Sequence, residues 1–175
     1  MAALSLWARL DAAFAAAFRA QMGATADYLR LQDVAVSETW NPDKGPFPRL
    51  ILYSTTARIG ASEHGGGGVR RLEVLYPYIA VAIAQADSYD AARDDAQALF
   101  GRMLGVLAGG GAILQTAMAA DPASTDEARR IMHERSGASG IEIRGREGGN
   151  AGLWRGIAVI AWGVETRTGV GAGGA

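Results

Sequence analysis

The residues with the greatest potential for chemistry lie beside a run of four glycines. His64 follows Glu63, which gives the residue types of a general-base pair, and Gly65–Gly68 have the composition of a phosphate-binding loop. A phosphate loop also needs Gly-Lys-Ser/Thr and a helix N-terminus after the glycines, but Val69-Arg70-Arg71 opens a strand pattern instead. A general base must also be held in place, which a glycine-rich loop does not do. We therefore expect neither a nucleotide site nor a catalytic base here.

The same charged residues have a second interpretation, as a partner-binding loop. Residues Ala57–Gly68 lack the side chains that would offset the entropy of ordering, so we expect a mobile loop in the free monomer. Its charges either serve solubility, or they engage acidic groups on a neighbouring subunit when the loop orders on binding. The candidate partner-binding residues are Arg58, Glu63, His64, Arg70 and Arg71.

Two pairs of acidic residues, Asp87 with Asp90 and Asp94 with Asp95, are further candidates for acid–base chemistry or metal binding. No histidine or third ligand is near them, and neighbouring acids on a surface helix usually form a solvated face. The chain has no cysteine and two histidines without His-x-x-x-His spacing, which removes the usual thiolate and zinc ligands. We expect no metal, no cofactor and no enzymatic activity.

Charge and hydropathy argue against three further classes of protein: nucleic-acid binders, membrane-spanning proteins and proteins exported by a signal peptide. The chain has 17 Lys and Arg against 18 Asp and Glu, so its formal charge of −1 creates no field that would attract nucleic acid. Met103–Ala120 is uncharged, but Gly109-Gly110-Gly111 makes it a poor membrane-spanning helix. Arg9 and Asp11 interrupt the apolar N-terminus, so a signal peptide is not expected. We expect a soluble protein with no specific nucleic-acid or membrane partner.

The four tryptophans have two expected roles. Trp7, Trp154 and Trp162 fall on predicted core faces, and packing is their expected role. Trp40 lies in turn sequence just before Asn41-Pro42, so it is either an exposed interface residue or a further packed one. Trp40 therefore joins the candidate partner-binding residues.

Apolar residues at intervals of three and four predict two main helices. The first covers Leu4–Met22, with Arg9 off its apolar stripe, and the second covers Asp87–Leu107, with Asp87-Ser88 as its N-cap. A capping-box-like Ser124-x-x-Glu127 predicts a brief exposed helix over Ser124–Arg135. Between these last two segments, residues 113–119 fit no element clearly.

Runs rich in β-branched and aromatic residues, separated by turn sequences, predict the strands. The longest, Val69–Gln85, contains Pro77, which marks a bulge or an unpaired edge position. The last, Leu153–Thr166, is apolar on both parities, as expected for a strand covered on both faces. The other predicted strands are Asp27–Ser37, Phe47–Thr56 and Ile141–Arg146.

The order of these elements predicts an α+β fold, with one mixed β-sheet, two main helices packed on one face and a long flexible loop. A chain of 175 residues, 49% of them hydrophobic, has material for one core, so residues 1–166 are expected to form a single domain. Residues 167–175 are glycine-rich and are expected to form a flexible C-terminal tail.

Several segments together resemble the lambda-type tail terminator proteins of long-tailed phages. The similarity runs in order through most of residues 3–166, and it departs between Ala108 and Gly140, where this chain is longer. Besides the N-terminal helix and strand, the matching segments are Phe47–Tyr53, the glycine-containing loop, Leu72–Ile83, the Asp87–Leu107 helix and, above all, Asn150-Ala151-Gly152-Leu153-Trp154 leading into the final strand.

The resemblance implies a structural virion protein that forms a hexameric ring on the tail tube, ends tube polymerisation and offers a surface for head–tail joining. The implied partners are further copies of the chain, the tail tube protein and a neck or head-completion protein. The implied location is the tail–neck junction of the virion, after assembly in the host cytoplasm. Two alternatives remain: a neck or head-closure adaptor, and a small-molecule-binding or hydrolytic domain whose active site escapes sequence reasoning.

Overall fold

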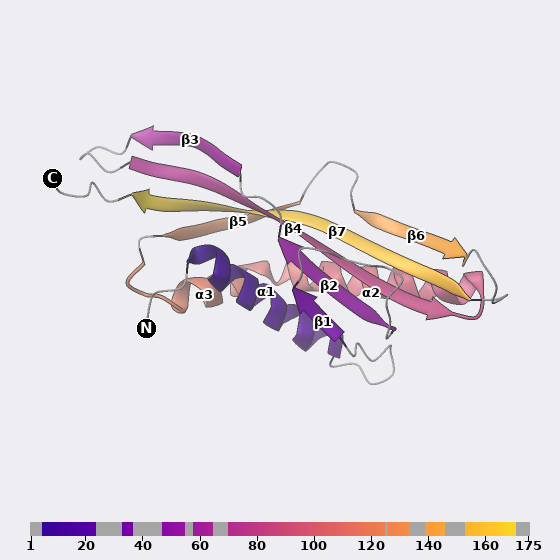
Figure 1. The fold of residues 1–175 in the computed structure, drawn as a ribbon. Coiled ribbons are helices and arrows are strands. Elements are labelled where there is room, and N and C mark those ends of the chain that lie inside the picture. The colour runs from indigo at the N-terminus through magenta and orange to yellow at the C-terminus, as the bar shows by residue number, and fades with distance from the viewer. Residues whose placement is uncertain are drawn as a thin grey trace.

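Two long antiparallel strands, β4 (Arg70–Ala86) and β7 (Trp154–Val170), run along the molecule (Figure 1). In this computed structural model all 17 residues of β4 pair with the 17 residues of β7 without a register shift. The structure describes residues 5–23, 33–36, 47–54, 58–64, 70–124, 126–133, 139–145 and 153–170. The two longest predicted strands are therefore confirmed, and they form the centre of the sheet.

Five shorter strands of the described residues complete the sheet around this central pair. β2 (Arg49–Ser54) and β3 (Arg58–His64) pair with successive stretches of β4. β6 (Gly140–Gly145) and β5 (Glu127–His133) pair with successive stretches of β7. β1 (Asp33–Val36) runs parallel to β2, whereas the other pairings are antiparallel, so the seven-stranded sheet is mixed as predicted.

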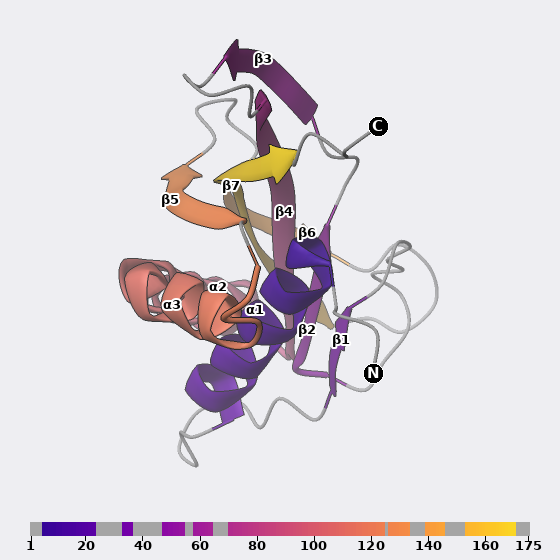
Figure 2. The same cartoon turned by 90° about the vertical axis from the view of Figure 1, so that its left-hand side faces the viewer.

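The helices α1 (Leu6–Gly23), α2 (Tyr89–Ala108) and α3 (Gly110–Ala119) lie together on one side of the sheet (Figure 2). The predicted N-cap of α2 is confirmed, because the Ser88 side chain accepts a hydrogen bond of 3.2 Å from the backbone N–H of Ala91. The α+β class with helices on one face is thus confirmed. The segment that fitted no element in the sequence forms α3.

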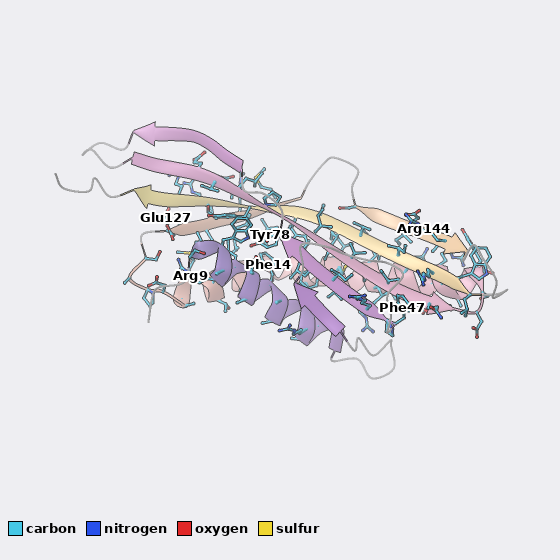
Figure 3. All side chains as sticks on the ribbon, viewed as in Figure 1. Arg9, Phe14, Phe47, Tyr78, Glu127 and Arg144 are labelled. Atoms are coloured by element: carbon cyan, nitrogen blue, oxygen red, sulfur yellow. The ribbon has the colours of Figure 1, made fainter. Side chains whose placement is uncertain are left out.

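The core between the helices and the sheet is centred on four aromatic rings. Phe14 and Phe18 of α1 lie 5.2 and 5.6 Å from the ring of Trp162 in β7, which is 5.5 Å from the ring of Tyr78 in β4 (Figure 3 labels Phe14 and Tyr78). None of these side chains is more than 1% exposed. Since full burial of one such side chain contributes about 2–3 kcal/mol, this cluster fastens α1 to both long strands.

The predicted packing role of the tryptophans holds fully for Trp162 and partly for the other two described tryptophans. Trp7 is partly buried with its ring 5.2 Å from that of Tyr76. Trp154 is also partly buried, and its ring makes an edge contact of 5.4 Å with the ring of the exposed Tyr89. The aromatic packing therefore extends from the core to the edge of the helical layer.

Gly156 allows α2 to lie directly against β7. A Cβ atom at this position would collide with the carbonyl oxygen of Ala92 and would lie 2.9 Å from the Cβ of Ala96. Ala92 and Ala96 are themselves fully buried. The alanine stripe of α2 therefore packs against the backbone of the strand, and the contact depends on a residue without a side chain.

Three expectations about local structure are wrong. Residues 127–133 of the predicted exposed helix form β5, and residues 58–64 of the predicted mobile loop form β3, whereas the four glycines lie outside the described residues. Residues 167–170 of the predicted flexible tail continue β7. In each case a long neighbouring strand offers an edge, and pairing with it outweighs a weak local preference.

Pro77 lies in the middle of β4, opposite Gly163 of β7. On the other side of β4, the registered pairing with β3 ends at Leu75 and the pairing with β2 begins at Tyr78. Residues 55–57, which connect β2 to β3, lie outside the described residues. The alternative of a bulge is wrong for the pairing of β4 with β7, whose register is unbroken, and the unpaired edge position stays a prediction.

Replacing Gly156 by alanine tests the close packing of α2. We expect Gly156→Ala to lower the free energy of unfolding by about 1–3 kcal/mol, because the strand and α2 must separate to admit the methyl group. Gly101→Ala is the matched control, since Gly101 is an exposed residue of α2 with no atom within 4 Å of an added Cβ. That change should instead stabilise the protein by about 0.5–1 kcal/mol. Urea unfolding measures both, and equal effects would contradict the assignment.

Candidate assembly surface

One end of the sheet forms what we call the arm, whose strand tips extend past the helices (Figures 1 and 2). Across the sheet it consists of β3, residues 70–77 of β4, residues 162–170 of β7, and β5. Within the described part of the chain, β3 pairs only with β4, and β5 pairs only with β7. The arm therefore has one unpaired edge on each side.

The arm gathers five of the six candidate partner-binding residues. In the β3–β4 register, Arg58 lies opposite Leu75, Glu63 opposite Arg71, and His64 opposite Arg70. These residues belong to two paired strands, which corrects the expectation that Arg58, Glu63 and His64 lie in a mobile loop. Trp40, the sixth candidate, lies outside the described residues.

The arm has two different faces, because side chains alternate across a strand. Tyr76 and Val164 point to the helices, where they join the core cluster. Glu73, Glu165 and Arg167 have the opposite parity and therefore lie on the face that points away from the helices. We call this second face the open face of the arm.

Ion pairs connect the charged side chains of the open face. Arg167 Nη2 lies 3.2 Å from Glu73 Oε1, and Arg130 Nε lies 2.7 Å from Glu165 Oε2. Arg129 Nη1 lies between the two glutamates, 3.8 Å from Glu73 Oε1 and 3.7 Å from Glu165 Oε1. Because Arg129 and Arg130 are 38% and 67% exposed, each pair that these two arginines form contributes less than about 1 kcal/mol. The network therefore determines the charge pattern of the face more than its stability.

Sequence reasoning missed this network for a specific reason. Arg129 and Arg130 fell within a predicted helix, where their side chains would have pointed in different directions from those in a strand. The alternation of Glu165 and Arg167 around Thr166 was the available signal, because it marks one polar face of a strand that continues past Thr166.

A nearly buried arginine of α1 positions β5 from behind (Figure 3 labels Arg9 and Glu127). The Arg9 side chain is 2% exposed, and its Nη2 lies 3.2 Å from Asp126 Oδ2. Arg9 also donates hydrogen bonds to Ser124 Oγ at 3.1 Å and to the Ala117 carbonyl oxygen at 3.4 Å. The sequence placed Arg9 only off the apolar stripe, and the structure shows why it is buried: α3 and the turn before β5 cover that side of α1.

Two further contacts join β5 to α3. The backbone N–H of Ala128 donates to Met118 Sδ at 3.3 Å. The Ile131 side chain occupies the space beside Gly110, where an added Cβ would collide with it. Together with Arg9, these contacts hold β5 in place as an edge strand.

Asp11 of α1 is a second partly buried charged group. Burial raises the pKa of its carboxyl above the ordinary value of 3.8, while Tyr78 and Trp7 oppose this shift as hydrogen-bond donors. Burial prevails because these contacts do not reach the geometry of a full hydrogen bond. No hydrogen-bond partner satisfies the buried atoms Asp11 Oδ1, Tyr78 Oη and Trp7 Nε1. Burial, followed by the charge of Asp11, also raises the pKa of the Tyr78 hydroxyl. The stability of the packing of α1 on β4 therefore depends on whether the Asp11 carboxyl is protonated.

The described segments contain no cluster of metal ligands and no single helix that could span a membrane. They contain no group of three or more His, Cys, Asp or Glu that could hold a metal ion. None of their helices is by itself long and apolar enough to cross a membrane, although α2 and α3 together meet that test by length and composition, with a bend of 53° between them.

Removal of the Arg9 charge tests how strongly β5 is anchored. We expect Arg9→Met to lower the free energy of unfolding by about 3 kcal/mol, because Asp126 and two oxygen acceptors lose their shared donor. Arg93→Met is the matched control, since Arg93 is 44% exposed and pairs with Asp90 and Asp94 at the surface of α2. The control should change stability by less than about 0.5 kcal/mol. Similar losses in the two variants would show that Arg9 is not a buried anchor.

The pH dependence of stability tests the environment of Asp11. The folded state binds the Asp11 proton more tightly than the unfolded chain, so this residue makes the protein less stable as pH rises from near 3.8 through its raised folded-state pKa. The amide side chain introduced by Asp11→Asn does not titrate. We expect the variant to gain stability relative to the parent over this window and the difference to stay constant at higher pH. A difference that changes in the opposite direction in pH-dependent unfolding would contradict the raised pKa.

A comparison of the chain with protein-family models finds no matching family, and a comparison with curated proteins finds no similar sequence.

Proposed function

We propose that this protein is a structural assembly protein that forms a ring and caps a phage tail tube. The observation that carries the proposal is the arm, whose two outer strands, β3 and β5, have no partner on their outer sides among the described residues. An exposed strand edge is a template for pairing with another chain. Because the edges belong to different strands, contact between them is heterologous, and such contacts repeat from copy to copy until a ring closes or a filament grows.

Charged residues on the arm support regulated rather than indiscriminate association. Glu127, Arg129 and Arg130 are exposed on the edge strand β5, and charges on edge strands suppress non-specific pairing in natural sheet proteins. Association then requires a partner edge whose charges are complementary. A second copy of the same chain provides such an edge.

The resemblance to lambda-type tail terminators supports a closed hexameric ring over an open filament. On this proposal the ring binds the tail tube protein on one side, ends tube polymerisation and presents the other side to a neck or head-completion protein. Its place is the tail–neck junction of the virion, after assembly in the host cytoplasm. The near-neutral chain fits binding of protein surfaces better than binding of nucleic acid.

The mass of the purified protein in solution tests the proposal. Native mass spectrometry, with and without added tail tube protein, should detect a hexamer, and negative-stain images should show rings that cap the ends of tubes. Only monomer under both conditions would contradict the proposal. A ring that binds the portal-side neck complex and ignores the tube would instead identify a neck or head-closure adaptor.

A further inference from the structure

We propose that neighbouring copies join by antiparallel pairing of β5 in one protomer with β3 in the next, in the register that places Arg130 opposite Glu63. This inference rests on the proposed function and specifies its subunit contact. The β5 edge of each protomer then pairs with the β3 edge of a neighbouring protomer. A second copy of the chain is therefore the occupant of both edges.

Strand direction supports this choice of edges. Each neighbouring pair across the arm is antiparallel, from β3 to β4, from β4 to β7 and from β7 to β5. After three reversals, β5 runs opposite to β3 of the same chain. A copy related by rotation about an axis along the strands keeps these directions, so its β3 meets β5 in an antiparallel arrangement. The four-stranded arm then repeats as an unbroken antiparallel sheet.

Pairing of identical edges would lead to a different assembly. Contact between two β3 edges or between two β5 edges requires a two-fold axis, because each strand must meet its own reversed copy. Such a contact uses the same surface on both partners and by itself stops at a dimer, and a longer assembly would have to alternate β3–β3 with β5–β5 contacts. That alternation would invert every second protomer, whereas the β5–β3 contact by itself repeats between copies of one orientation and so builds a ring with two different faces.

The unbroken β4–β7 ladder limits the possible registers. A one-residue slip would turn core-facing positions of one protomer toward the open face of the next, so allowed registers differ by steps of two. Glu127 is aligned through Arg167 with Glu73, and Arg130 is aligned through Glu165 with Leu75. Both therefore have the open-face parity although they are three residues apart, because the register of β5 on β7 shifts by one residue between Ala128 and Arg130. Glu63 is aligned with Arg71, a position of the same parity.

Charge distinguishes the two face-preserving registers that overlap most of both strands. One of them places Glu63 opposite Glu127, and directly opposed like charges destabilise a strand pair. The other slides the strands by a further two positions and places Glu63 opposite Arg130, which is an attractive pair. The Arg130 side chain is 67% exposed, so it is accessible to a neighbouring chain. The structure thus favours the Arg130–Glu63 register.

The strands β5 and β3 differ in the number of elements that fix them in place, which suits a docking contact. Arg9, Met118 and Ile131 fasten β5 to the helices from behind. For β3, the described contacts with other elements are dominated by its pairing with β4. The β5 edge therefore presents a fixed template, against which the neighbouring β3 aligns.

Engineered cysteines test the contact cleanly, because the natural chain contains none. Directly opposed residues of an antiparallel pair have Cα atoms about 4.5–5.5 Å apart, within the range that a disulfide spans. Under mild oxidation, the double variant Glu63→Cys/Arg130→Cys should give a ladder of covalent oligomers on a non-reducing gel, ending at the closed ring. The single variants Glu63→Cys and Arg130→Cys should not give this ladder. Glu63→Cys/Glu127→Cys, the matched control for the other register, should lose most of it.

The outcomes separate this inference from the proposed function. Rings that form without cross-linking in Glu63→Cys/Arg130→Cys would overturn the inference and leave the ring proposal standing, as would a ladder only in Glu63→Cys/Glu127→Cys. Covalent dimers from either single variant would indicate pairing of identical edges and would also overturn it. Failure of the unmodified protein to assemble, with or without tube protein, would instead contradict the proposed function.

Charge exchange gives an independent measurement: Arg130→Glu should abolish ring formation, and adding Glu63→Arg should restore it.

Discussion

The unbroken pairing between β4 and β7 is the constraint on which the rest of the structure depends. The other five strands pair with this ladder directly, or through β2 in the case of β1. The helices pack on one of its faces, through the aromatic rings of Tyr78 and Trp162 and through the close contact at Gly156. Because the register is continuous, the same alternation of side chains that builds the core in one half defines the open face of the arm in the other.

Periodicity predicted the elements whose burial is one-sided and continuous. The stripes of α1 and α2 and the long apolar runs of β4 and β7 have a pattern that does not depend on a distant partner, and each is confirmed. One question that the sequence left open was also local. Pro77 was restricted to a bulge or an unpaired edge position, because proline lacks an N–H donor. The unbroken β4–β7 register excludes a bulge on that side of Pro77, and the unpaired edge position stays a prediction.

The errors share one physical cause, which is pairing with a strand far away in the sequence. Residues 127–133 have the composition of an exposed helix, and they become a strand because the edge of β7 is available to them. Residues 58–64 pair with β4 for the same reason. The burial of Arg9 equally depends on α3 and on Asp126, which lies 117 positions along the chain. For the candidate surface, the sequence therefore identified charged residues around the glycines but missed the network that includes Arg129, Arg130 and Glu165.

Pro77 has a consequence for how the sheet resists bending. It lies where the registered pairing of β4 passes from β3 to β2, and its ring nitrogen has no hydrogen to donate to a neighbouring strand. On the other side of β4, the pairing with β7 continues past Pro77 without a register shift. Among the described residues, the stiffness of the sheet at this point is therefore supplied by the two long strands, which join the arm and the helix-covered part of the sheet.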